Sequence, residues 1–266
     1  MQLRTIRRLS MSVAALVGAT VLVPDSAHAI TFGTFDATNK YANVGSLIVT
    51  IPDEGNFQLC TGTLISPTVV LTASHCLVGF PDDWVIGFTL APIIDADQDG
   101  EVDAGITPMT ATAHANPLFA SGGANNTFDV GVLVLDQAVQ GVTPASLPDL
   151  GELNSKAAQR ATYVAVGYGT VRNDKTTGQH ALGVGWRREY AAQTINSVTK
   201  SWVTLSMNPS TGNGGTCYGD SGGPHFNADG EVVSVTVTGD RWCRSTDKTY
   251  RIDTADAQDF LTQYLD

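Results

Sequence analysis

Three side chains whose types can combine into nucleophilic chemistry lie far apart in the chain: His75, Asp129 and Ser221. A serine hydroxyl is a weak nucleophile unless a neighbouring base removes its proton, and histidine is a suitable base near neutral pH. A carboxylate that orients the imidazole completes such a set. The three residues therefore predict covalent catalysis by a serine, provided that the fold brings them together.

Ser221 lies in the segment Gly219-Asp220-Ser221-Gly222-Gly223. Glycines on both sides permit a tight, exposed turn and leave room for a substrate backbone. The pattern G-x-S-x-G also occurs in the nucleophile elbow of α/β-hydrolases, which place the acid and the histidine after the serine. Here His225 alone among the histidines follows Ser221. An esterase of that fold is therefore disfavoured.

Each of the three residues also has a purely structural interpretation. His75 could be a packing histidine, Asp129 a cap at a strand start in competition with Asp136, and Ser221 a turn residue. Their joint occurrence in this order favours catalysis. The remaining histidines of the chain after its start are expected at the surface or in loops: His114, His180 and His225.

The elements that must position these residues are short apolar runs rich in β-branched residues, separated by Gly, Pro, Asn and Asp. This pattern is typical of an all-β barrel or sandwich. A helix is expected at the end of the chain, with Asp253 or Thr254 as its cap. The runs are residues 44–51, 68–72, 84–90, 130–135, 162–166 and 232–237, and the apolar face of the helix is Ala257, Phe260, Leu261, Tyr264 and Leu265.

Residues 1–29 are expected to be a signal peptide, because basic residues precede a short apolar stretch and Ala27-His28-Ala29 resembles a cleavage site. The net charge of −11 argues against nucleic acid as a partner. After signal removal no membrane attachment is expected. Four cysteines in an exported chain suggest two disulfides, for which three pairings exist.

The segments LTASHC, FDVGVLVL and CYGDSGGP resemble the catalytic signatures of the trypsin/chymotrypsin family, in its His, Asp, Ser order. The likeness runs from Ile30 to the final helix and is that of a bacterial-type secreted member. It implies two antiparallel six-stranded Greek-key barrels with a C-terminal helix, over residues 30–266. The first barrel would cover about 30–145 and the second about 146–266.

The resemblance also implies a role for each matching residue. Ser221 attacks the scissile carbonyl of a polypeptide, His75 transfers the proton, and Asp129 orients His75. The backbone N–H groups of Gly219 and Ser221 form the oxyanion hole. The implied disulfides join Cys60 to Cys76 and Cys217 to Cys243. No cofactor is expected to be required for catalysis. The protein is expected to be a monomer, and protein inhibitors are possible partners.

In this family a new N-terminal Ile or Val forms an ion pair with the Asp that precedes the nucleophile. The corresponding pair here is Ile30 and Asp220, and cleavage after Ala29 would expose Ile30. The hypothesis is that export processing itself releases the active form. An alternative for the whole chain is a catalytically silent binding module on the same scaffold, although no triad residue is replaced.

The substrate pocket implied by the resemblance has Gly215 at its floor, with Thr216 beside it. Trypsin-like enzymes carry Asp at the floor, so cleavage after basic residues is not expected. Gly239 and Lys248 would stand on the far wall. If Lys248 points inward it could meet an acidic residue, and if it points outward the pocket suits apolar or small side chains. Val237 departs from the serine that usually supports the catalytic Asp.

Alternating carboxylates in residues 95–100 resemble a calcium loop. The sequence lacks the glutamate of an EF-hand at the twelfth position, and an acidic solvated turn is the alternative. The hypothesis is a structural calcium site formed by Asp95, Asp97, Asp99 and Asp103.

Overall fold

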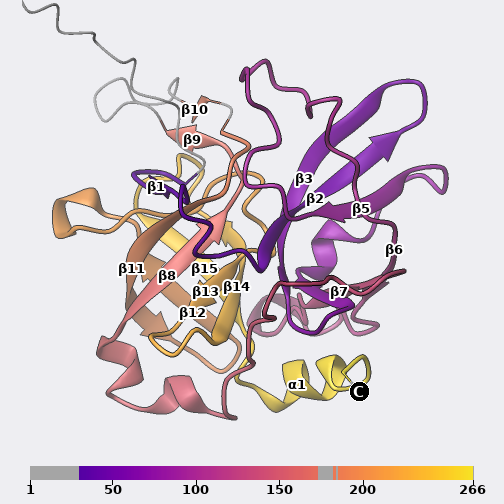
Figure 1. The fold of residues 1–266 in the computed structure, drawn as a ribbon. Helices are drawn as coiled ribbons and strands as arrows, with labels where there is room; N and C mark the ends of the chain where they lie inside the picture. Colours follow the sequence, from indigo (N-terminus) through magenta and orange to yellow (C-terminus); the bar gives the residue numbers. More distant parts are fainter. Residues whose placement is uncertain (1–29, 173–181, 184, 266) are drawn as a thin grey trace, which may run out of the picture.

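The computed structural model describes residues 30–172, 182–183 and 185–265. The proposed signal peptide and His180 lie outside these residues. The described chain forms two six-stranded antiparallel barrels and one C-terminal helix, which confirms the predicted fold (Figure 1). Among the described residues, no helix has the length and apolar character needed to cross a membrane.

The first barrel has the strand order β5-β2-β3-β4-β7-β6. It closes where Phe88 of β5 and Met109 form an isolated bridge. Alternating side chains point inward and pack around Leu47, Phe88 and Leu133. The strands are β2 (Val44–Ile51), β3 (Gly55–Leu64), β4 (Val69–Thr72), β5 (Val85–Thr89), β6 (Ala111–Ala115) and β7 (Gly131–Leu135).

The second barrel has the order β11-β12-β15-β14-β13-β8 and closes through pairing of β11 with β8. Two-residue β1 (Thr34–Phe35) adds to β11, and β9 (Val171–Arg172) pairs with β10 (Leu182–Gly183). The barrel strands are β8 (Thr162–Gly167), β11 (Glu189–Val198), β12 (Trp202–Ser206), β13 (Pro224–Phe226), β14 (Val232–Gly239) and β15 (Thr246–Arg251).

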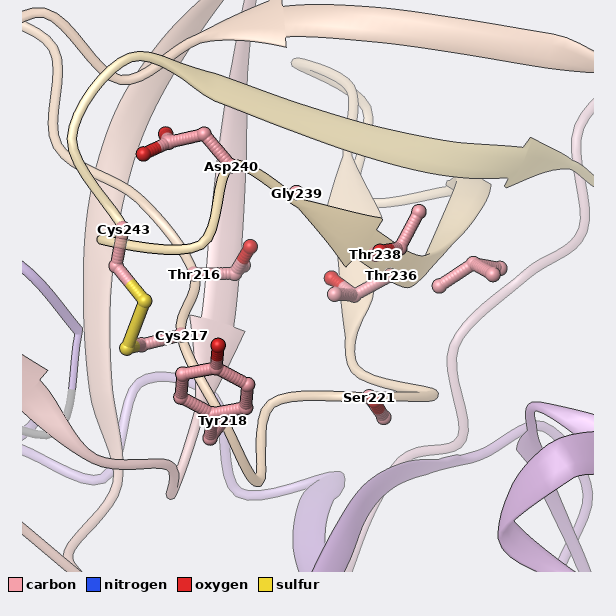
Figure 2. A pocket seen from close by; sticks show the side chains of 10 residues that line it. Thr216, Cys217, Tyr218, Ser221, Thr236, Thr238, Gly239, Asp240 and Cys243 are labelled. Atoms are coloured by element: carbon pink, nitrogen blue, oxygen red, sulfur yellow. A yellow bond between two sulfur atoms is a disulfide. The ribbon is translucent and has the colours of Figure 1, made fainter.

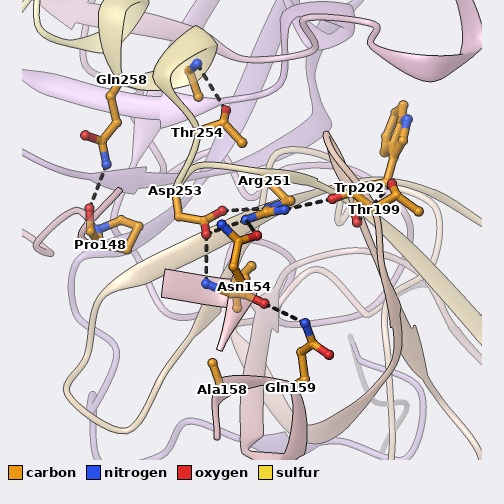
Figure 3. A network of polar contacts seen from close by, with 12 residues as sticks. Pro148, Asn154, Ala158, Gln159, Thr199, Trp202, Arg251, Asp253, Thr254 and Gln258 are labelled. Carbon is orange, nitrogen blue, oxygen red and sulfur yellow. Dashed lines mark hydrogen bonds and ion pairs between the residues drawn. The ribbon is translucent and has the colours of Figure 1, made fainter. Parts of the chain in front are cut away.

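The segment that joins the barrels is tied to the end of β15 by a buried polar network (Figure 3). Arg251 donates to Asp253 through Nε and Nη2, at 2.8 and 2.7 Å, and to the Thr199 carbonyl at 2.7 Å. Its Nη2 also contacts Asn154 Oδ1 at 3.0 Å, while the Leu153 N–H donates to Asp253. Because the partners come from three separate segments, this network holds the linker against the second barrel.

Helix α1 (Ala255–Leu261) follows directly and is capped by Thr254, whose hydroxyl accepts the Ala257 N–H at 3.3 Å. Ala257, Phe260 and Leu261 are buried against the core, as the apolar face predicts. Tyr264 and Leu265 are half-buried beyond the helix end and extend the same contact.

The expectation that His225 is a surface or loop residue is wrong. It lies in β13 with no exposed surface, and its Nε2 is 3.0 Å from Oδ2 of the equally buried Asp247 on β15. Gln193 Nε2 donates to the same Asp247 oxygen at 3.1 Å. A polar side chain can point into a barrel when other side chains there satisfy its hydrogen bonds. Such partners come from distant strands and cannot be recognised from the sequence around the residue. His114 is half-buried on β6 and packs on the Tyr264 ring.

Candidate active site

His75 and Asp129 meet at the end of the first barrel. Strands β4 and β7 pair with Thr72 opposite Gly131, so the residues that follow β4 and precede β7 are neighbours. His75 lies in a single 3-10 turn, Ser74–Cys76, where Asp129 accepts both its backbone N–H at 2.9 Å and its ring Nδ1 at 2.8 Å. Asp129 is 4% exposed and the His75 side chain 32% exposed. The carboxylate thus fixes the ring while Nε2 remains available for proton transfer.

Ser221 lies on a turn that packs against the end of β4. A Cβ added to Gly222, whose φ is +76°, would lie 2.0 Å from Thr72 Oγ1 and 2.8 Å from the Ala73 nitrogen. Only glycine permits this approach, and it brings the serine turn to the segment that leads into His75. The Thr61 N–H also holds the Ser221 carbonyl at 2.9 Å. No hydrogen bond joins the Ser221 hydroxyl to His75 in the described part of the chain.

The N–H groups of Gly219 and Ser221 donate no hydrogen bond within the residues that the structure describes. The Gly219 carbonyl, by contrast, accepts Gln58 Nε2 at 2.9 Å and Thr61 Oγ1 at 3.1 Å. These two side chains of the first barrel fix the orientation of the loop and were not predicted from the sequence. Two uncommitted donors beside a nucleophile are what an oxyanion hole requires.

A pocket of about 130 Å³ opens beside Ser221 (Figure 2). Thr216 and Gly239 line it, as the sequence predicts. Gly215 and Lys248 are not among the described residues that line it. The disulfide between Cys217 and Cys243 also lines the pocket, as the family resemblance implies. The sequence did not predict the other lining residues, which are Tyr218, Thr236, Val237, Thr238 and Asp240.

Gly215 lies behind the pocket, against the interior of the barrel. A Cβ there would come within 2.1 Å of Met207 Cγ and 2.7 Å of Gln193 Nε2. Lys248 points elsewhere, and its ammonium lies 4.1 Å from the centre of the Trp202 ring in a cation–π contact. Of the two orientations considered for Lys248, the structure shows the outward one.

Tyr218 links the two walls of the pocket, and Asp240 orders one of them. Tyr218 Oη donates to the Arg241 carbonyl at 3.1 Å, beside the Cys217–Cys243 disulfide. Asp240 accepts the N–H groups of its own loop from Trp242, Arg244, Ser245 and Thr246. The Asp240 carboxylate therefore points toward its own loop and not toward the space that a substrate side chain would fill. The other disulfide joins Cys60 to Cys76 beside the His75 turn.

The two residues of the expected activation pair lie in buried positions. The Ile30 nitrogen donates to Glu189 Oε2 at 3.3 Å, while Asp220 accepts the N–H groups of Gly169 and Cys217 at 2.7 and 2.8 Å. No hydrogen bond joins Ile30 to Asp220 in the described chain. Val237 is a pocket-lining residue, and both oxygens of Asp129 are occupied by His75.

The acidic loop brings carboxylate oxygens of Asp95, Asp97 and Asp99 within 4.8 Å of one another. Asp95 is buried and accepts the N–H groups of Asp99 and Gly100. Asp103 accepts the Ala96 N–H at 3.1 Å and lies outside this cluster. Calcium binding stays a prediction.

The chain is similar to several known proteins. A family model described as Trypsin matches residues 36–261. Glucanase inhibitor protein 3 of Phytophthora infestans is 32% identical over 176 residues, which are 65% of this chain and 62% of that protein. Serine protease grass of Drosophila melanogaster is 28% identical over 181 residues, 62% of this chain and 46% of that protein. The chain thus spans less than two thirds of these two relatives.

A solved structure titled HL collagenase is similar in fold, with a TM-score of 0.63 and 18% sequence identity. The match covers 88% of this chain and 97% of the solved one. At this level of identity the likeness supports the architecture of two barrels alone.

Proposed function

The chain belongs to the trypsin family, and on this premise we propose that it is a secreted serine endopeptidase with a His75–Asp129–Ser221 triad. The observation that carries the proposal is the double contact of Asp129 with the backbone and ring of His75, next to the turn that presents Ser221. Secretion is supported by the signal-like start of the chain and by the two disulfides.

In the proposed reaction the Ser221 Oγ attacks the scissile carbonyl carbon while Nε2 of His75 takes the hydroxyl proton. Asp129, on Nδ1, stabilises the imidazolium. The oxyanion accepts the N–H groups of Gly219 and Ser221, each worth about 3 kcal/mol in the transition state. The C–N bond then breaks as His75 protonates the leaving amine, and water hydrolyses the acyl-enzyme by the same steps in reverse.

We infer further that the pocket receives an uncharged side chain. Its lining of threonines, Val237 and Gly239 suits a small or apolar side chain. Lys248 is engaged with Trp202, and the Asp240 carboxylate is engaged with its own loop. A substrate Lys or Arg would therefore be desolvated without a matched partner.

Hydrolysis of an unfolded polypeptide tests the proposal. Ser221→Ala is expected to abolish cleavage, whereas Ser210→Ala, which changes an exposed serine in the 3-10 helix Pro209–Thr211, should leave the rate unchanged. Sequencing the products of a mixed peptide library then reports the preferred side chain. Cleavage chiefly after Lys, Arg, Asp or Glu would contradict the assignment of the pocket.

A second candidate is a binding module, favoured by the similarity to a protein named a glucanase inhibitor. A chain with this role would bind another protein without turnover. Absence of cleavage by a correctly folded wild-type protein, together with a Ser221 that does not react with a fluorophosphonate, would favour this candidate.

A further inference from the structure

Gly219 has a backbone conformation that favours glycine, with a φ of +95°. Its N–H shares a peptide unit with the Tyr218 carbonyl, which accepts the Thr170 N–H at 2.7 Å. Because N–H and C=O point in opposite directions across a trans peptide, this contact orients the Gly219 N–H. The direction of the Ser221 N–H relative to it depends on the rotations between the two residues, of which those at glycine are the freest.

Thr61 of β3 holds the backbone at these two residues. Its Oγ1 donates to the Gly219 carbonyl at 3.1 Å, and its backbone N–H donates to the Ser221 carbonyl at 2.9 Å. Thr61 is fully buried. One residue of the first barrel therefore binds the carbonyls of both residues whose N–H groups are proposed to form the oxyanion hole.

The direction in which the Thr61 hydroxyl donates is set by its other partner. Tyr168 donates its backbone N–H to the Thr61 Oγ1 at 3.2 Å. A hydroxyl has one proton, and with this N–H on its acceptor side the proton is directed to the Gly219 carbonyl. Gln58 Nε2 donates to the same carbonyl at 2.9 Å. The Gly219 carbonyl thus accepts two side-chain donors from the first barrel, one for each lone pair.

Thr61 is also linked to the segment that carries the base. Its carbonyl accepts Thr72 Oγ1 at 2.9 Å, and Thr72 ends β4 three residues before His75. A Cβ added to Gly222 would lie 2.6 Å from the Thr61 carbonyl oxygen, so the serine turn packs directly on Thr61. Thr61 therefore lies between the base, on the first barrel, and the nucleophile loop, on the second.

Resting on the proposed function, we propose that Thr61 is a positioning residue of the oxyanion hole. Its hydroxyl and its N–H set the distance and angle between the Gly219 and Ser221 donors, and the residue itself does not contact the substrate. Donors of this kind stabilise the transition state because they are oriented before the charge develops. Loss of the hydroxyl therefore weakens transition-state stabilisation and leaves binding of the ground state nearly unchanged.

Thr61→Val tests the hydroxyl, because it removes the oxygen and keeps a β-branched side chain. We expect kcat for peptide hydrolysis to fall about tenfold, with KM within about twofold of wild type, a smaller loss than the roughly 10²–10³-fold that removal of a whole donor costs. Thr61→Ser keeps the hydroxyl and should restore kcat to within about threefold of wild type. Steady-state kinetics on one peptide measure both constants.

Thr63→Val is a matched control on the same strand. Thr63 lies two residues further along β3 and is equally buried, and its hydroxyl has no hydrogen-bond partner among residues 30–172, 182–183 and 185–265. We expect this variant to keep the wild-type kcat and KM. An equal loss of kcat in Thr61→Val and Thr63→Val would overturn the proposal, and so would an unchanged kcat in Thr61→Val.

Gln58→Leu supplies a second test, should Thr61→Val fail to fold. Gln58 is half-buried and provides the other donor to the Gly219 carbonyl. If the hold on this carbonyl positions the oxyanion hole, Gln58→Leu should lower kcat about 2–10-fold with little change in KM. A kcat equal to that of wild type, or a rise in KM alone, would count against the proposal.

Failure of the proposed function gives a different result. The amide and carbonyl NMR resonances of Gly219 and Ser221 report on the loop without any substrate. A wild-type protein that hydrolyses no peptide, but whose loop resonances shift in Thr61→Val and stay in place in Thr63→Val, would refute catalysis and leave the hold of Thr61 on the loop established. Resonances that do not shift in Thr61→Val would overturn the proposal, whatever the activity.

Discussion

The phenol of Tyr218 donates a hydrogen bond to the backbone carbonyl of Arg241 at 3.1 Å, joining the two segments that the Cys217–Cys243 disulfide also joins. The pocket beside Ser221 is therefore bounded by the disulfide that Figure 2 shows and by one polar link. The polar link belongs to an exposed side chain and can be removed without loss of the core.

Tyr218→Phe removes this link and keeps the ring. A hydrogen bond of this kind contributes about 0.5–1.5 kcal/mol, so KM for a peptide with a small apolar residue at the cleavage site should rise roughly 2–10-fold with kcat little changed. Steady-state kinetics on one peptide measure both constants. An equal fall in kcat and kcat/KM would instead place Tyr218 in transition-state stabilisation.

Asp240 is expected to make the pocket loop sensitive to acid. Burial raises the pKa of Asp240, but the N–H groups of Ser245, Thr246, Arg244 and Trp242 outweigh it and hold the pKa below the usual value of 3.8. Because the folded-state pKa is lowered, this stabilisation is complete above pH 3.8 and is lost as the pH falls through the folded-state pKa.

Asp240→Asn should reproduce the acid state at pH 7. Allowing for partial exposure, we expect a loss of about 1 kcal/mol and a Tm lower by about 2–4 °C. Thermal melts from pH 2 to 7 measure this. The difference between variant and wild type should shrink below pH 3.8, and a constant difference across that range would contradict the assigned role.

Asp129→Asn tests the orienting carboxylate. The amide cannot stabilise the imidazolium and favours the wrong tautomer of His75, so kcat should fall about 10⁴-fold while the fold is preserved. Peptide hydrolysis near pH 8 measures the effect, with Asp136→Asn, an exposed aspartate, as the control. A loss of less than tenfold would show that Asp129 does not orient the base.

His225→Leu tests the buried pair inside the second barrel. It leaves Asp247 without its histidine partner, and breaking such a pair costs about 3–5 kcal/mol of unfolding free energy. Denaturant unfolding measures the loss, with His114→Leu on the half-buried face of β6 for comparison. An equally small effect of the two variants would mean that the pair contributes little.

The sequence predicts those features that depend on local pattern. Short apolar runs identify β2, β4, β5, β7, β8 and β14, and the glycines around Ser221 indicate its turn, because local composition and positive φ can be recognised in a short stretch of sequence. The chain order of His75, Asp129 and Ser221 distinguishes the trypsin/chymotrypsin fold from the α/β-hydrolase fold. Thr254 caps the helix that the apolar spacing predicts.

Features that depend on distant contacts could not be predicted in this way. The buried pairing of His225 with Asp247 joins positions 22 residues apart across the barrel. Glu189 meets Ile30 across 159 residues, and no spacing rule marks it. The spacing from Tyr250 predicts that Lys248 lines the pocket. In the structure its side chain points outward from the strand, and its ammonium packs on the Trp202 ring.

The central claim, that Ser221 is an activated nucleophile, is tested most directly by the site of reaction with a fluorophosphonate. Intact mass and peptide mapping of the treated protein should show one phosphonyl group per chain, attached to Ser221. Ser221→Ala should remain unlabelled, and His75→Ala should label at least about 10³-fold more slowly because its base is missing. A folded wild-type protein that stays unmodified, or carries the label on another residue, would contradict the account.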